Sequence, residues 1–158
     1  MLQLIDTTNN KSHFIDFGQN KWVWLARWSS DGRKLALLVT EGMPPVDYSH
    51  LYILEWPENK FYQIGTDKFN FVTEMAWAPN SSHLLFLPVI DYQDGVETIG
   101  LYITDVVNPS ETAPIPIPVE GLIGYKGSLS WAPDGKKILV EYLNKSEYSL
   151  YQVDVLLQ

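Results

Sequence analysis

The most informative segment of this chain is SLSWAPDGKKILVEY, residues 128–142. Polar and apolar residues alternate, a Pro-Asp-Gly turn follows Trp131, and a second apolar alternation begins after two lysines. An alternation with a period of two predicts a strand, and a turn of this composition between two strands predicts a β-hairpin. The same pattern occurs as LARWSSDGRKLALLV at 25–39 and as EMAWAPNSSHLLFLP at 74–88. The chain therefore contains a repeat.

The spacing of the repeat is regular. Its tryptophans, Trp28, Trp77 and Trp131, are 49 and 54 residues apart. A second motif follows each of them, as LYILE from Leu51, LYITD from Leu101 and LYQVD from Leu150, and a related LQLID begins at Leu2. These four leucines are separated by 49, 50 and 49 residues. The repeating unit is therefore about 50 residues long, a period that indicates a repeat architecture.

The middle unit contains four predicted strands, at 71–77, 83–89, 98–106 and 112–119. The last of them holds three prolines, which cannot donate to a strand ladder, so we expect it at the edge of a sheet. No segment shows a 3.6-residue period that would indicate a helix. The sequence therefore predicts an all-β fold built from units of four antiparallel strands, which is typical of β-propeller blades.

The repeated motif W-(S/A)-(P/S)-(D/N)-G-(K/R)-K-(I/L), followed by L-Y-x-(V/I)-D, resembles the WD40-like (PD40) repeats of TolB-type β-propellers. Such repeats also occur in the propeller domains of prolyl oligopeptidases. The resemblance covers essentially the whole chain. The second copy departs from it, with Asn80-Ser81-Ser82 in place of Asp-Gly-Lys, and the first copy has Ser30 in place of proline. All these residues are compatible with a turn.

The residues that define the repeat are expected to be structural. Aspartate accepts hydrogen bonds from nearby backbone amides in turns, and glycine adopts a positive φ. The tryptophans are expected to pack between adjacent blades. This structural set is Trp28, Asp31, Gly32, Trp77, Trp131, Asp134 and Gly135.

The strands add up to about three and a quarter blades. The predicted bounds are 2–18 for two outer strands, 22–64 and 71–119 for two whole blades, and 124–155 for a blade without its last strand. Complete propellers have about four to eight blades. Three arrangements stay open: a piece of a larger propeller, an open arc, or a homodimer closing a ring of about six blades. In the homodimer the outer strand SHFIDF, residues 12–17, would complete the last blade of the other copy.

Composition restricts the partners. The net charge of −8 makes a nucleic-acid partner unexpected, because an acidic surface repels phosphates. No apolar run approaches the roughly 20 residues that span a bilayer, so we expect no membrane insertion. The start, MLQLIDTTNNKSHF, lacks the pattern of a signal peptide. The resemblance to TolB implies the periplasm for a longer parent protein, and otherwise the cytoplasm is expected.

The candidate binding residues lie in connections between strands. In a propeller the connections between second and third strands and those between blades share one face, and binding residues concentrate in such loops. The connections within blades at 42–49, 91–98 and 144–148, with those between blades at 18–21, 65–70 and 120–127, predict an acidic, tyrosine-lined face for a basic peptide or protein segment. The alternative is that these loops are merely solvated. The candidates are Asp47, Tyr48, Asp91, Tyr92, Asp94, Glu97, Tyr125 and Lys126.

Nothing in the sequence indicates catalysis, a metal or a cofactor. There is no cysteine and no G-x-S-x-G, G-x-G-x-x-G or P-loop motif. The segment DYQDGVE does not match a calcium loop, and the three histidines have no close spacing. A weaker hypothesis is acid–base chemistry by Asp91 and Asp94. The predicted function is a non-catalytic interaction module, with a small ligand as a further candidate occupant. The alternative is a gating accessory of a peptidase or other hydrolase whose catalytic domain is absent from this chain.

Overall fold

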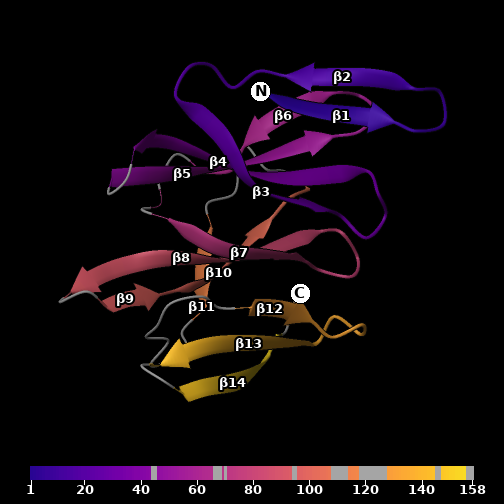
Figure 1. The fold of residues 1–158 in the computed structure, drawn as a ribbon. Coiled ribbons are helices and arrows are strands. Elements are labelled where there is room, and N and C mark those ends of the chain that lie inside the picture. Colours follow the sequence, from indigo (N-terminus) through magenta and orange to yellow (C-terminus); the bar gives the residue numbers. More distant parts are fainter. Residues whose placement is uncertain are drawn as a thin grey trace.

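The computed structural model contains β-strands and no helix in the residues that it describes, as Figure 1 shows, and the all-β prediction is confirmed. In this part of the chain no segment is a helix long and apolar enough to cross a membrane. The described residues are 1–43, 46–65, 69, 71–93, 96–107, 114–117, 128–144 and 147–155.

The N-terminal half forms a two-stranded and a four-stranded sheet. The N-terminal hairpin consists of β1 (Leu2–Asp6) and β2 (Lys11–Ile15). The four-stranded sheet, called sheet I here, has the strand order β3-β4-β5-β6 and is antiparallel throughout. Its strands are β3 (Lys21–Trp28), β4 (Lys34–Met43), β5 (Val46–Glu55) and β6 (Lys60–Gln63).

Two further antiparallel sheets follow. Sheet II has the order β11-β10-β8-β7, with β9 also paired to β8, and sheet III has the order β12-β13-β14. The strands of sheet II are β7 (Val72–Trp77), β8 (His83–Gln93), β9 (Val96–Ile99), β10 (Leu101–Asp105) and β11 (Ile115–Ile117). Those of sheet III are β12 (Ser128–Trp131), β13 (Lys137–Asn144) and β14 (Glu147–Asp154). The proline-rich strand β11 lies at the sheet edge, as predicted.

The prediction of a single strand at 98–106 is wrong, because the structure divides this segment at Gly100 into β9 and β10. The pairing between β8 and β9 shifts its register between Val89 and Asp91. A Cβ atom at position 100 would approach the ring of Tyr102 to 2.8 Å and the side chain of Ile90 to 3.0 Å. Glycine therefore allows the close approach at which the strand is interrupted.

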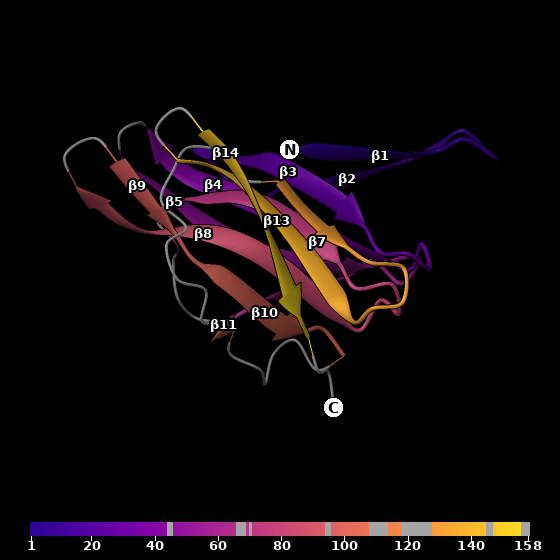
Figure 2. The same cartoon turned by 90° about the horizontal axis from the view of Figure 1, so that it is seen from below.

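The sheets succeed one another from the N-terminal hairpin to sheet III, with β3, β7 and β12 as neighbouring strands (Figures 1 and 2). Alternate residues of each central strand face opposite neighbours. On β8, Leu84 and Phe86 pack against sheet I, whereas Leu85 and Leu87 pack against sheet III. Both faces of this strand are buried, which explains its continuous apolar sequence.

The repeated turns share one backbone geometry. A side-chain oxygen of Asp31, Asn80 or Asp134 accepts a hydrogen bond from the amide two residues later, at 3.0, 3.1 and 2.9 Å. Gly32, Ser81 and Gly135 occupy equivalent positions with φ of 68°, 59° and 72°. The Asn-Ser-Ser copy therefore keeps the conformation of the Asp-Gly copies.

The loops expected at 42–49, 91–98 and 144–148 are largely strands, so this expectation is wrong. Backbone pairing continues to Met43↔Val46 between β4 and β5, and to Gln93↔Val96 between β8 and β9. The pairing of β13 with β14 continues to Asn144↔Glu147. Strand pairing satisfies the backbone polar groups of these polar segments, and each connection becomes a long hairpin.

Candidate functional site: the hairpin face

The hairpins β4–β5, β8–β9 and β13–β14 extend to the same side of the molecule (Figures 1 and 2). The turns β3–β4, β7–β8 and β12–β13 lie on the opposite side (Figure 1). This arrangement follows from antiparallel pairing in stacked sheets, because equivalent connections then leave each sheet at the same end. We call the surface formed by the tips of the three hairpins the hairpin face.

Four of the predicted binding residues lie on the hairpin face. Tyr48 is exposed on β5, and Tyr92 is 63% exposed near the tip of β8, directly opposite Glu97 of β9. The carboxylate of Asp91 accepts hydrogen bonds from the Tyr92 amide at 2.8 Å and from the Gln93 side chain at 3.0 Å. The β8–β9 tip thus presents a tyrosine beside an oriented carboxylate.

Four other candidates have no described side chain. The backbone of Asp47 belongs to β5, opposite Gly42, but its side chain lies outside the description. Asp94, Tyr125 and Lys126 lie outside the described residues altogether.

Sequence reasoning did not single out Glu147 and Tyr148, although the segment that contains them was identified. They begin β14, and Tyr148 is 74% exposed at the tip of the β13–β14 hairpin. The signal was the equivalence of this segment to the connections that hold Tyr48 and Tyr92.

A polar cluster lies beneath the β4–β5 tip. The Glu41 Oε2 atom lies 3.1 Å from Nε2 of the buried His50 and 3.4 Å from Nζ of Lys21. Thr40 and Ser49 are buried nearby, and their hydroxyls have no partner among the described residues. Cross-strand pairing brings these residues together, so their spacing in the sequence did not reveal the cluster.

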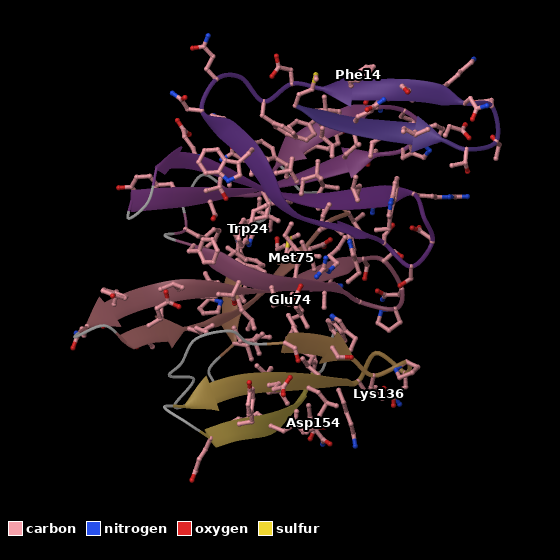
Figure 3. All side chains as sticks on the ribbon, in the orientation of Figure 1. Phe14, Trp24, Glu74, Met75, Lys136 and Asp154 are labelled. Carbon is pink, nitrogen blue, oxygen red and sulfur yellow. The ribbon has the colours of Figure 1, made fainter. Side chains whose placement is uncertain are left out.

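The opposite side of the molecule carries a groove of about 990 Å³ between the turns of sheets II and III. Lys136 and Asp154, labelled in Figure 3, contribute to its lining. Between sheets I and II the hydroxyl of Ser81 bridges the equivalent turns by accepting a hydrogen bond from the Asp31 amide at 3.1 Å. Gly135 replaces Ser81 in the next turn and has no side chain to form such a bridge.

The described residues contain no group of three or more histidine, aspartate or glutamate side chains that is arranged to hold a metal ion. Asp31, on the turn side, is one of the carboxyl groups whose pKa is lowered. The Ser29 hydroxyl, 2.6 Å from Asp31 Oδ1, and the Arg33 amide lower the pKa of Asp31 from its ordinary value of 3.8. Hydrogen bonds to the charged form are the cause, and they stabilise the turn.

No protein-family model matches the sequence, and no curated protein matches it either. Solved structures do match. TolB from Acinetobacter baumannii superposes with a TM-score of 0.67 at 16% identity, over 96% of this chain and 34% of TolB. The β-propeller domain of the Trilobed protease from Pyrococcus furiosus gives 0.65 at 18% identity, over 97% of this chain and 46% of that one. An oligogalacturonate lyase in complex with manganese gives 0.67 at 13%, over 98% and 41%.

These likenesses establish the fold. The chain has a TolB-like β-propeller fold, and its four-stranded sheets are propeller blades. It spans between about a third and a half of the length of these solved structures, so the described fold is a partial propeller.

Proposed function

We propose that this chain is a non-catalytic interaction module that binds a basic peptide or protein segment on its hairpin face. The observation that carries the proposal is the exposure of Tyr92 and Tyr148, 63% and 74%, at hairpin tips on one side of the molecule. Tyrosine provides a large contact area and a hydroxyl at a small cost in conformational entropy, as in antibody binding loops.

The charges of the hairpin face favour a cationic occupant. Asp91, Glu97 and Glu147 lie at the tips, and none of them forms an ion pair within the described residues. The chain as a whole carries a net charge of −8, which attracts cations and accelerates their association at low salt. We therefore expect binding that weakens as the salt concentration rises.

The strand pairing of the hairpins supports the same function. Each hairpin continues the paired strands of a blade, so the tyrosines project from a scaffold that is anchored in the core. A side chain that is already positioned loses less entropy on binding than one on a free loop.

The test is a titration of a fluorescently labelled peptide of alternating lysine and glycine, followed by anisotropy. Tyr92→Ala and Tyr148→Ala are each expected to weaken binding about fivefold or more, as truncation of an aromatic contact residue does. The matched control is Phe14→Ala, because Phe14 is an exposed aromatic residue on β2, outside the hairpin face (Figure 3). A peptide of glutamate and glycine is expected not to bind.

Two results would contradict this function. One is the absence of binding of the lysine peptide at low salt. The other is that the Tyr92→Ala and Tyr148→Ala variants bind the lysine peptide as tightly as the Phe14→Ala variant does.

A second candidate is the propeller portion of a peptidase or other hydrolase that controls substrate entry. The likeness to the propeller domain of the Trilobed protease favours it, although an identity of 18% extends only to the fold. Sequencing the complete coding region tests this candidate. A downstream G-x-S-x-G motif in a strand–turn–helix context supports it, and the absence of any catalytic domain contradicts it.

A further inference from the structure

Adjacent blades are joined by the same hydrogen bond at two places. The indole Nε1 of Trp77 in sheet II donates to the carbonyl oxygen of Arg27 in sheet I at 2.8 Å. The Nε1 of Trp131 in sheet III donates to the carbonyl oxygen of Ala76 in sheet II at 3.3 Å. In both cases the acceptor immediately precedes the repeat tryptophan of the neighbouring blade. The repeat therefore defines a specific contact between innermost strands.

Trp28 holds the equivalent position in sheet I without this contact. Its side chain is 48% exposed, whereas that of Trp77 is 8% exposed. Among the described residues the indole of Trp28 has no hydrogen-bond partner. The N-terminal hairpin covers Leu35 and Leu37 on this side of sheet I, but its two strands do not supply an innermost strand beside β3. At this end of the stack the indole N–H of Trp28 is therefore available for the hydrogen bond that joins adjacent blades.

Sheet III presents the complementary surface at the other end of the stack. Leu139 and Leu150 are exposed on its outer side, Leu150 to 66%. In sheet II the equivalent residues are Leu85 and Leu101, and both are buried against the next sheet. The carbonyl that precedes the repeat tryptophan of sheet III is that of Ser130. Sheet III therefore carries a hydrogen-bond acceptor for a Trp28 indole, and it exposes apolar residues at the positions through which sheet II packs against its neighbour.

We propose that two copies of this chain associate so that sheet III of each packs against sheet I of the other, with the Trp28 indole donating to the carbonyl of Ser130 of the partner subunit. The contact occurs twice around a two-fold axis and leaves no unmatched surface of this kind, which is the usual way in which oligomers close. The proposal does not depend on the function of the hairpin face.

The strand order indicates how sheet III gains a fourth strand in this dimer. The outer strand β6 pairs with the third strand β5 in sheet I, and β11 pairs with β10 in sheet II. In sheet III, β14 is the third strand and no described strand pairs with its outer edge. The fourth-strand candidate is β2, whose neighbour β1 carries the same LxxxD motif as β14. β1 and β14 therefore compete for pairing with the same edge of β2.

In the assembly β14 replaces β1 beside β2 of the other copy. β14 keeps its eight residue pairs with β13 and binds β2 through its other edge, whereas β1 pairs only with β2 among the described strands, over five residue pairs, so β1 is the strand that leaves. The shared motif places Leu150 opposite Ile15 of the partner subunit. It also places Asp154 opposite Lys11 of the partner subunit, as Glu55 is opposite Lys60 in sheet I. The β1–β2 backbone pairs are replaced by β14–β2 pairs, and Leu139 and Leu150 become buried where Leu2 and Leu4 of the displaced β1 packed before.

The strands then form six complete blades. Each copy supplies sheets I and II, and each shared blade consists of β12, β13 and β14 of one copy with β2 of the other. Two copies contribute four whole and two shared blades, a number within the range of closed propellers. Closure also pairs the outer edge of β14 with β2 of the other copy.

The first test is the mass in solution by light scattering after size-exclusion chromatography, over a dilution series. A mass twice that of the 18.1 kDa chain is expected at high concentration. Trp28→Ala and Leu150→Asp are each expected to raise the dissociation constant of the dimer by about tenfold or more, because each removes a buried contact of the interface. The control is Ile115→Asp, an exposed residue of β11 outside the interface.

The dimer is wrong if the mass stays that of one chain at every concentration. A dimer that Trp28→Ala and Leu150→Asp leave unchanged also overturns the proposed interface. Both substituted residues are exposed in the single chain, and circular dichroism checks that the variants remain folded.

The second test uses the absence of cysteine from the chain. An Ile15→Cys chain is mixed with a Leu150→Cys chain under mild oxidation. Directly opposed residues on antiparallel strands are close enough for a disulfide, so a covalent pair of the two chains is expected on a non-reducing gel. An Ile115→Cys chain replaces the Leu150→Cys chain in the control. A dimer that forms without this cross-link would overturn the replacement of β1 by β14.

Discussion

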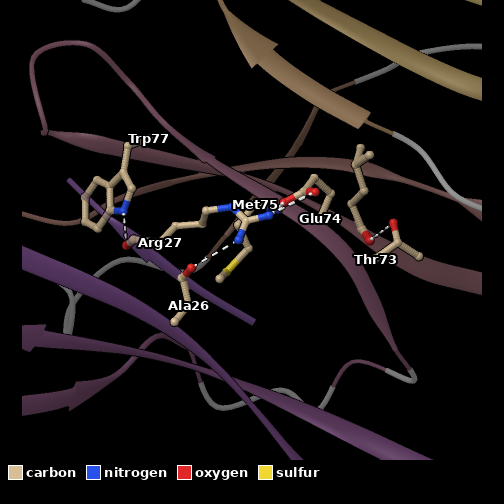
Figure 4. Close-up of polar contacts among 7 residues, drawn as sticks. Ala26, Arg27, Thr73, Glu74, Met75 and Trp77 are labelled. Carbon is tan, nitrogen blue, oxygen red and sulfur yellow. Dashed lines mark hydrogen bonds and ion pairs between the residues drawn. The ribbon is translucent and has the colours of Figure 1, made fainter. Parts of the chain in front are cut away.

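The indole nitrogen of Trp77 lies 2.8 Å from the carbonyl oxygen of Arg27, a residue 50 positions earlier in the chain (Figure 4). The guanidinium of the same arginine contacts the carboxylate of Glu74 at 2.9 and 3.2 Å. One residue of β3 is thus bound twice by β7, through its backbone and through its side chain. The two contacts join sheet I to sheet II at their innermost strands.

The Trp77 contact is expected to contribute measurably to stability. Trp77→Phe keeps an aromatic ring but removes the donor, and should lower the free energy of unfolding by about 1–2 kcal/mol. Trp131→Phe should cost less, because its hydrogen bond is longer at 3.3 Å and the side chain is only half-buried. Urea unfolding followed by circular dichroism provides the measurement. An equal or larger cost at Trp131 would contradict this ranking.

The Arg27–Glu74 ion pair is expected to contribute little, because both side chains are partly exposed, at 43% and 21%. A double-mutant cycle with Arg27→Gln and Glu74→Gln should give a coupling energy of about 0.3–1 kcal/mol, which falls as salt is raised to about 1 M. Chemical unfolding in urea at two salt concentrations measures it. A coupling that does not depend on salt would show that the pair is more shielded from solvent than its exposure indicates.

Acid stability is expected to depend on Asp31. Its folded pKa lies below the ordinary value of 3.8, so the unfolded chain binds more protons as the pH falls below that value. The contribution of Asp31 is therefore fully present above about pH 5 and is lost as the pH falls through the folded pKa. Asp31→Asn should remove this part of the acid dependence of the unfolding free energy.

A second substitution tests the cause of that shift. Ser29→Ala removes the hydroxyl that donates to Asp31 at 2.6 Å, and should raise the pKa of Asp31 toward its ordinary value. An NMR titration of the carboxyl carbon follows this change directly. An unchanged titration curve would mean that the backbone amide of Arg33 is sufficient to lower the pKa.

Phe86 is expected to be the most sensitive position in the core between sheets I and II. It is fully buried, and its ring centroid lies 5.1 Å from that of Phe69 and 5.7 Å from that of Tyr102. Phe86→Ala should lower the free energy of unfolding by about 3–5 kcal/mol, because the cavity cannot collapse between two packed sheets. The exposed Phe14 offers a matched control, and Phe14→Ala should cost less than about 1 kcal/mol. Similar costs at both positions would contradict the placement of the core.

The local features of this protein could be predicted from its amino-acid sequence. Alternation around Trp28, Trp77 and Trp131 identified the hairpins, and the turn residues after each tryptophan indicated conformations that the structure contains. These features depend on contacts within about ten residues, where side-chain periodicity and backbone preferences act directly. The regular spacing of the repeat then led to the propeller fold.

The contacts between residues of different strands and sheets could not be predicted in this way and became visible in the three-dimensional fold. The pairing of β4 with β5 brings Glu41 to His50, and strand pairing turns three predicted loops into hairpins that carry Tyr92 and Tyr148 to one face. Sheet stacking buries Trp77 and leaves the equivalent Trp28 exposed. Identical motifs acquire different environments because burial depends on the neighbouring sheet, and the local sequence of a strand does not encode its neighbour.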